Sequence, residues 1–237
     1  MDNWIYEHSN DNKYRYALGT KGERTLICIG VNPSTADPTS LDPTLKTVER
    51  IAKQNGYDSY LMLNLYPQRA TNPKDMDKIK DVFIGNENLD IIRKYLLKGN
   101  CDIWAAWGTL ITMRPYLALY LNKIYHLCYG KENNWYARGN ISKDGHPHHP
   151  LYVRKTDKFE IFDIHEYIKK YVGPIVQRDK ADDLCLMPIL QEDLQCKDCI
   201  FRYDTSIIAG NVSKCEIYSE VKPLKAIDGN CDEYVKD

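Results

Sequence analysis

Apolar residues in this chain gather either in short continuous runs or in stretches with helical spacing. The run Thr25–Gly30 is typical of a buried strand, and four apolar residues share one face of a helix expected over Thr44–Asn55. The same order recurs twice, and a fourth strand is then predicted. These elements are strand Ser59–Leu65 and helix Asn86–Leu97, strand Asp102–Trp107 and helix Thr109–Leu121, and the fourth strand Lys123–Cys128.

Alternating strands and helices predict an α/β fold. Strands that are apolar throughout are buried on both faces, and strand–helix–strand crossovers make successive strands parallel. We therefore expect three layers, αβα, around a central and mainly parallel four-stranded sheet. Tyr14–Leu18 is expected to add an edge strand, Glu132–His149 to form a loop, and Ile164–Tyr171 to form a closing helix.

Length and charge divide the chain into two parts. Its 237 residues, 43% of them hydrophobic, suffice for one α/β domain and a small appendage. Through Gly173 there are 24 Lys and Arg against 20 Asp and Glu, and beyond it 8 against 13. We expect an α/β domain over residues 1–173, a linker over 174–190 and a module over 191–237. The first part lacks the dense basic face of a tight duplex-DNA binder.

Neither a membrane span nor a secretory signal is apparent. No apolar run approaches the roughly 20 residues that a spanning helix needs, and the N-terminal residues combine no basic start with an apolar stretch. We therefore expect no membrane association and a cytoplasmic location.

The eight cysteines are unevenly distributed. Cys28, Cys101 and Cys128 lie in apolar segments and are interpreted as core residues. Four others in the last part have the spacing of a tetrahedral thiolate site, for which zinc is expected and an iron–sulfur cluster is the alternative; these are Cys196, Cys199, Cys215 and Cys231. A tail of free thiols is a further alternative. The acidic module is expected to dock on its own domain or on a protein partner.

Residues just beyond the carboxyl ends of parallel strands are the ones that usually meet a ligand. Four unusual segments fall at such positions: Gly30–Asp37, Asn64–Thr71, Trp107–Thr109 and Gly145–Tyr152. We therefore expect a ligand site at this edge of the sheet.

These segments resemble motifs of a known superfamily. Gly30-Val-Asn-Pro-Ser resembles the first motif of mismatch-specific uracil-DNA glycosylases, Gly-Ile-Asn-Pro-Gly, and His149-Pro-Leu151 resembles the second motif, His-Pro-Ser. Ala106-Trp-Gly108 resembles the Leu-Trp-Gly segment of the third strand. Over about Tyr14 to Val153 the blocks look closest to a bacterial and phage family, domain of unknown function 1643. The resemblance implies a uracil-DNA glycosylase-like fold.

The resemblance also implies a reaction, hydrolysis of an N-glycosidic bond in DNA or a nucleotide. Such a reaction passes through an oxocarbenium-like sugar, and it needs a group that positions water and a donor for the anion that develops on the base. By resemblance, the side-chain carbonyl of Asn32 would orient the water, and His149 would donate to a base oxygen. Asn64 would read the base edge, because an amide supplies both a donor and an acceptor.

Further residues are candidates for binding a nucleobase, a nucleotide, or a single-stranded or flipped DNA base. Arg69 and the backbone amides around Ser34 and Thr35 would meet a phosphate, and Gly30 and Pro33 belong to the same block. Three aromatic side chains would offer stacking surfaces for an unstacked base: Tyr66, Trp107 and Tyr152.

Several of these residues have plainer explanations. The block around Asn32 suits an Asx or Ser/Thr turn, Trp107 suits a core position, and Asn64 suits the end of a strand. Leu151 stands where active glycosylases usually carry serine. Two further hypotheses therefore stand beside the enzyme: a non-catalytic protein that binds a nucleotide, a modified base or a nucleotide-derived signal, and an interaction module that recruits a partner.

Three neighbouring histidines are a second candidate metal site. They are His146, His148 and His149, and no carboxylate or cysteine close in sequence completes the set.

Overall fold

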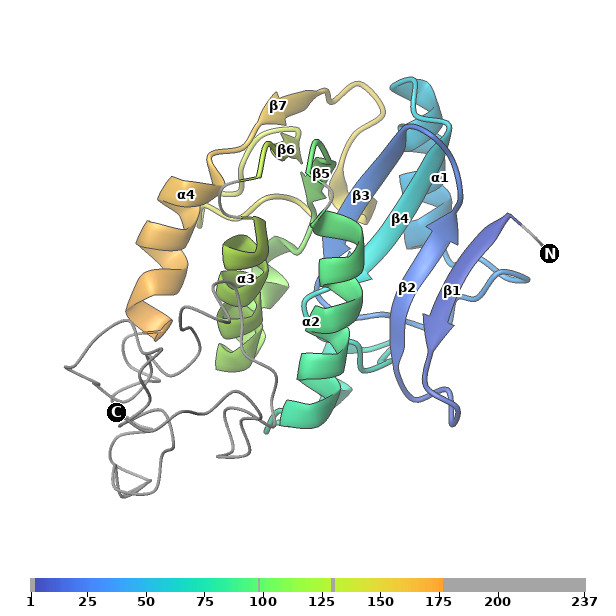
Figure 1. Ribbon diagram of the computed structural model, residues 1–237. Coiled ribbons are helices and arrows are strands. Elements are labelled where there is room, and N and C mark those ends of the chain that lie inside the picture. Colours follow the sequence, from blue (N-terminus) through green and yellow to red (C-terminus); the bar gives the residue numbers. More distant parts are fainter. Residues whose placement is uncertain (1–2, 98, 129–130, 177–237) are drawn as a thin grey trace, which may run out of the picture. The chain divides into compact units, whose positions relative to one another are not determined.

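The computed structural model describes residues 3–97, 99–128 and 131–176, which form one α/β unit (Figure 1). The strands are β1 (Trp4–His8), β2 (Arg15–Thr20), β3 (Thr25–Gly30), β4 (Ser59–Asn64), β5 (Asp102–Ala105), β6 (Asn134–Arg138) and β7 (Phe159–Ile161). The α-helices are α1 (Pro43–Gln54), α2 (Val82–Leu96), α3 (Pro115–Cys128) and α4 (Ile164–Tyr167). A π-helical turn, Ile168–Val172, continues α4, and short 3₁₀ helices lie at Pro73–Asp75, Gly108–Met113 and Pro150–Tyr152.

The strands form one seven-stranded sheet in the order β1-β2-β4-β3-β5-β6-β7. The four strands in its centre, β4, β3, β5 and β6, pair in parallel. The outer strands pair antiparallel. The sheet is therefore mixed, and it is larger than the four central strands and one edge strand expected from the sequence.

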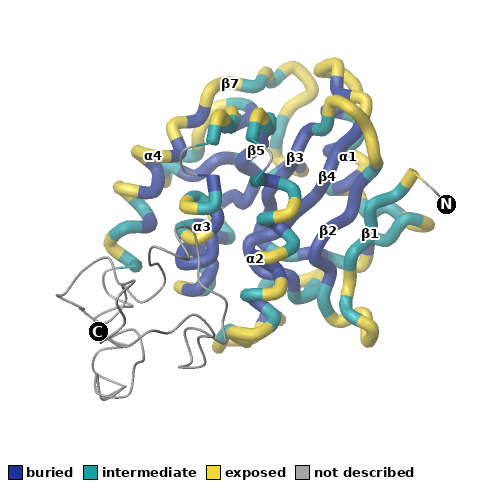
Figure 2. Tube along the Cα trace, viewed as in Figure 1, coloured by how far each residue is buried: buried dark blue, intermediate teal, exposed yellow. Residues whose placement is uncertain are grey.

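The helices cover both faces of the sheet, as Figure 1 shows for α2 and α3 on one face and α1 on the other. The apolar face of α1 packs against Leu26, Cys28 and Met62, whereas α2, α3 and α4 pack against Ile27, Ile29 and their neighbours on the opposite face. Successive strand residues point to opposite faces, so the continuous apolar runs in β3 and β4 are explained by burial on both sides (Figure 2).

The start of α1 is fixed by its capping residue. The Asp42 carboxylate accepts the backbone N–H of Leu45 at 2.8 Å, and Pro43 occupies the first helical position. The structure thereby holds the loop from Gly30 to Asp42 between the end of β3 and a fixed helix start.

The fourth predicted strand is wrong. Residues 123–128 are the last turns of α3, and the fourth parallel strand is β6, which lies within the stretch expected to be a loop. A short apolar run cannot be assigned to strand or helix by periodicity alone, and Ile124 and Cys128 lie four residues apart on the buried face of α3. In β6 the alternate residues Trp135 and Ala137 are buried.

The observed elements differ from the prediction in two further details. Tyr14–Leu18 belongs largely to β2, which is internal because β1 pairs on its outer side. The helix expected over Thr109–Leu121 is a 3₁₀ helix as far as Met113, and α3 begins at Pro115. Cys28 and Cys128 are buried, as expected of core residues.

Most of the predicted linker and the whole four-cysteine module, with Cys196, Cys199, Cys215 and Cys231, lie outside the described residues. Within residues 3–97, 99–128 and 131–176, no helix is long and apolar enough to cross a bilayer.

Candidate functional site

The first and second candidate segments meet at the carboxyl edge of the sheet. Gly30 ends β3, Asn64 ends β4, and the two are register partners in the parallel pair. A Cβ atom on Gly30 would lie 3.1 Å from the Asn64 Oδ1 atom and 2.6 Å from the Met62 Cε atom. Gly30 therefore leaves the space that the Asn64 side chain uses.

Asn64 carries a buried amide without a partner. The residue is 0% exposed, and neither its Nδ2 nor its Oδ1 atom forms a hydrogen bond within the described part of the chain. Leaving such a group unpaired costs about 1–3 kcal/mol, and most buried polar groups in proteins are paired. Asn64 is one of several side chains with buried and unpaired polar atoms, and it is the one that ends a parallel strand at the carboxyl edge.

Asn32, in the loop after β3, is oriented by its own amide. Its Nδ2 group donates to the backbone carbonyls of Pro33 and Ala70, both at 2.9 Å. Both hydrogens of the NH₂ group are therefore used, and the Oδ1 atom is the group left to accept a hydrogen bond from water or ligand.

The loop after Asn32 is held by two arginines. Arg69 donates through Nη1 to the carbonyls of Ser34 (2.7 Å) and Ala36 (3.2 Å), and Arg15 donates through Nη1 to the same Ala36 carbonyl at 3.0 Å. Pro33 is buried, whereas Thr35 is exposed. Arg69 thus holds the loop through two of its carbonyls. Arg15 was not a candidate from the sequence, because it lies before the first recognised motif.

His149 precedes the 3₁₀ helix Pro150–Tyr152 and caps it. Its Nδ1 atom accepts the backbone N–H of Leu151 at 3.3 Å. The proton of a neutral ring is then on Nε2, which makes Nε2 the donor. Burial lowers the pKa of His149 to about 4, partly opposed by the Asp42 carboxylate, so the ring is neutral near pH 7.

The third and fourth segments also meet. Gly108 has a φ of +61°, in the left-handed region that glycine tolerates, and a Cβ there would lie 3.4 Å from the His149 Cβ atom. The Trp107-Gly108 turn therefore packs directly beneath His149.

A buried relay anchors the loop that carries His149. Trp107 Nε1 donates to the Tyr167 hydroxyl at 3.1 Å, and that hydroxyl lies 2.7 Å from His146 Nδ1. Burial lowers the pKa of His146, partly opposed by the Asp144 carboxylate. Sequence reasoning missed Tyr167, because its partners lie 21 and 60 residues away along the chain.

The relay also gives a structural role to one of the three neighbouring histidines. His146 serves a structural hydrogen bond, and no group of three or more potential metal-ligating side chains is found among the residues that the structure describes.

The aromatic candidates separate into two kinds. Trp107 and Tyr66 are 0% exposed and belong to the core, and Tyr66 is further fixed by accepting the Asp81 backbone N–H at 2.8 Å. Neither offers a face for stacking, and both are corrected to core residues. Tyr152 is 76% exposed, with its ring centroid 6.0 Å from that of His149.

Comparison with known proteins supplies a family. The family described as "Protein of unknown function (DUF1643)" matches residues 15–151. The chain belongs to the DUF1643 family. No curated protein and no solved structure matches it significantly.

The DUF1643 match covers the residues described above at the carboxyl edge. It begins at Arg15 and ends two residues after His149, so it includes Asn32, Asn64 and Arg69. Tyr167 lies beyond its end.

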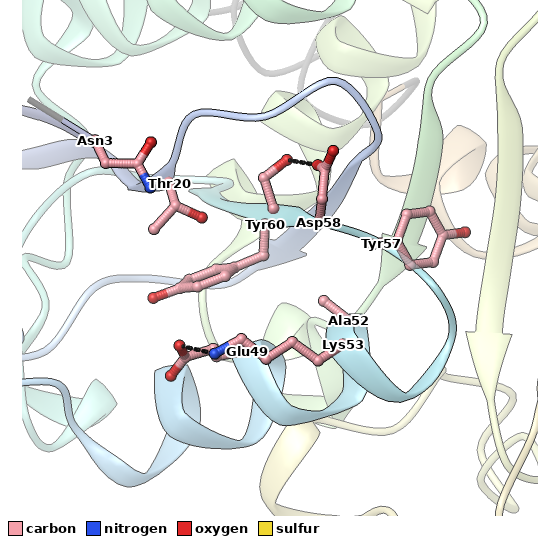
Figure 3. A pocket seen from close by; sticks show the side chains of 9 residues that line it. Asn3, Thr20, Glu49, Ala52, Lys53, Tyr57, Asp58 and Tyr60 are labelled. Atoms are coloured by element: carbon pink, nitrogen blue, oxygen red, sulfur yellow. Dashed lines mark hydrogen bonds and ion pairs between the residues drawn. The ribbon is translucent and has the colours of Figure 1, made fainter.

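A separate pocket of about 170 Å³ lies at the other end of β4 in this DUF1643 member. Figure 3 shows the ion-paired Glu49 and Lys53 of α1 on one side and Tyr60 of β4 on another. None of the candidate residues from the sequence lines it.

Proposed function

We propose that this protein hydrolyses an N-glycosidic bond in DNA or a nucleotide and that Asn64 recognises the base. The observation that carries the proposal is the buried, unpaired amide of Asn64 beside Gly30. The hydrogen-bonding edge of a nucleobase presents adjacent donors and acceptors, and an amide matches such a pair. The resemblance of the Asn32 and His149 blocks to glycosylase motifs supports the same conclusion.

His149 would stabilise the departing base. As the bond from C1′ to the base nitrogen breaks, its electron pair goes to the base, and negative charge spreads to a base oxygen. The neutral ring would donate from Nε2 to that oxygen, and a fixed donor of this kind contributes several kcal/mol to a transition state.

Asn32 would position the water. Its Oδ1 atom accepts one hydrogen of the water while the water oxygen bonds to C1′, and the proton that the water loses balances the charge of the departing base. An amide does not remove a proton, so Asn32 orients the water and the cationic sugar makes the water reactive.

A non-catalytic base- or nucleotide-binding protein is the second candidate. Two observations favour it: Leu151 replaces the serine of active glycosylases and is 49% exposed, and no carboxylate is hydrogen-bonded to Asn32 or His149 within the described residues. Binding would use the Asn64 amide in the same way without the chemical step.

Base release tests the two candidates. Single- and double-stranded oligonucleotides and nucleotides with uracil, hypoxanthine or modified pyrimidines would be incubated with the wild type, Asn32→Ala and His149→Ala. If the protein is an enzyme, the wild type should release a base, and the rate of release should fall at least about 100-fold in either variant. Retention of a nucleotide without release from any substrate would contradict the enzyme and support the binding protein.

We also propose, from spacing alone, that Cys196, Cys199, Cys215 and Cys231 hold zinc. Elemental analysis of the purified chain is expected to find zinc, and Cys196→Ser with Cys199→Ser to remove it. Iron with visible absorbance would instead identify a cluster.

A further inference from the structure

Arg15 is a buried cation without a carboxylate partner. It is 2% exposed, its Nη1 atom donates to the Ala36 carbonyl, and its Nε atom has no hydrogen-bond partner among the described residues. Arg69 lies beside it, and the Nε atom of Arg69 is likewise buried and unpaired. No ion pair joins either guanidinium to an acid within the described part of the chain.

The two charges repel each other. Burial and the neighbouring Arg69 lower the pKa of Arg15 to about 10, and Asp42 only partly offsets them. Asp37 is the other acid near the pair, and its carboxylate is occupied by Thr39 and Ser40. A buried charge without a partner is expensive, and a second like charge adds to that cost.

Holding the loop does not require both arginines. Arg69 alone reaches the carbonyls of Ser34 and Ala36, and Arg15 adds only a second bond to the Ala36 carbonyl. The bond made by Arg15 therefore duplicates an existing one, while its charge makes the site strongly positive.

Two backbone donors of the same loop are unpaired. The N–H groups of Ser34 and Thr35 donate no hydrogen bond to any residue that the structure describes. Guanidinium groups are charge-assisted donors to phosphate, and unpaired loop amides also bind anions.

We propose that Arg15 and Arg69 form a phosphate site under the loop after β3, and that the substrate is a nucleotide whose phosphate binds there while Asn64 reads its base. The inference rests on the proposed function for the base and on the arginine pair for the phosphate. The preferred substrate would then be a nucleotide, which carries a phosphate ester, and not the free nucleoside.

Inorganic phosphate is the first probe. Isothermal titration of the full chain at constant ionic strength, set with sodium chloride, would compare the wild type, Arg69→Gln and Arg93→Gln. Arg93 is the matched control, because within the described part of the chain its one ion pair is with Asp90 of the same helix, α2. The wild type and Arg93→Gln are expected to bind phosphate alike, and Arg69→Gln at least about 10-fold more weakly.

Asp42→Asn keeps the test independent of loop folding. Asparagine also caps a helix, so α1 is retained, while the acid that offsets Arg15 is lost. The proposal expects this variant to bind phosphate about 3-fold more tightly than the wild type. Identical phosphate binding in the wild type, Arg69→Gln and Asp42→Asn would overturn the proposal.

The source of the phosphate is distinguished by comparing a nucleoside, its 5′-monophosphate and a short single-stranded oligonucleotide with the same base. Preference for either phosphorylated form supports the site, and the stronger of the two identifies a nucleotide or nucleic-acid ligand. Base release that is equal for nucleoside and nucleotide would overturn the phosphate site and leave the proposed function standing. Phosphate binding that depends on Arg69, without base release, would overturn only the proposed function.

Discussion

Gly30 lies directly opposite Asn64 across the parallel strands β3 and β4, and a side chain on Gly30 would come within 3.1 Å of the Asn64 amide oxygen. Gly30→Ala should therefore displace the amide. The Met62 Cε atom is the flexible end of a side chain and can move, so we expect a loss of only about 1 kcal/mol in the free energy of unfolding. Base release or nucleotide affinity should fall at least about 10-fold, as measured on the panel of oligonucleotides and nucleotides.

Gly173→Ala is the control for this substitution, because among the described residues a Cβ there meets nothing closer than the Ile168 carbonyl oxygen at 3.6 Å. If Gly30→Ala retained full activity, the amide of Asn64 would not be reading the ligand.

Tyr167→Phe tests the relay that anchors the His149 loop. It removes the acceptor of Trp107 Nε1 and the partner of His146 Nδ1, both buried, so we expect about 1–3 kcal/mol of destabilisation and about 10-fold slower base release. Tyr136→Phe is a suitable control, since the Tyr136 hydroxyl forms no hydrogen bond within the described residues. Unchanged base release in a destabilised Tyr167→Phe protein would show that the relay serves stability alone.

We expect the pKa of His149 to set the acid limb of base release, because protonation places a hydrogen on Nδ1 and breaks the hydrogen bond from the Leu151 N–H that holds the ring. Because the folded pKa is about 4 and the ordinary value 6.5, the ring stays neutral as the pH falls to about 5, and base release should decline only near pH 4. A midpoint at pH 6.5 would show that the ring is not buried as described.

The same shift predicts a change in stability. The unfolded chain takes up the proton first, so stability is fully present above about pH 6.5 and is lost as the pH falls towards 4. The loss due to His149 is at most about 3 kcal/mol. Chemical denaturation at several pH values should show a shallower dependence in His149→Gln, and an equal slope in both proteins would argue against the assignment.

Continuous apolar runs predicted β3, β4 and β5 and their parallel pairing, because burial on both faces leaves a strong signal. The same kind of apolar run gave a wrong prediction at the end of α3, where residues 123–128 were expected to form a strand and instead continue the helix. The strand β6 was missed because Asn134, Tyr136 and Arg138 interrupt its apolar residues.

The sequence predicted the candidate site from the residues that follow strands. It did not predict the contacts that hold those residues in place. Asn32, Asn64 and His149 stand in recognisable blocks, whereas Arg15 and Tyr167 act through partners far away in sequence. Burial decided the aromatic residues: Trp107 and Tyr66 were candidates for stacking on a base, and both are 0% exposed in the folded chain. The unpaired state of Asn64 is likewise a property of the folded chain.

The most direct measurement combines stability and base release in Asn64→Leu. Leucine has a similar shape and removes a buried, unpaired amide, so we expect an unfolding free energy equal to or above that of the wild type. Asn88→Leu is the contrast, because the Asn88 amide donates to the carbonyls of Asn64 and Leu65 and its loss should destabilise the fold. We expect the wild type to release a base, and Asn64→Leu to be at least as stable and to release none. An Asn64→Leu protein that is strongly destabilised, or that releases the base as fast as the wild type, would contradict this expectation.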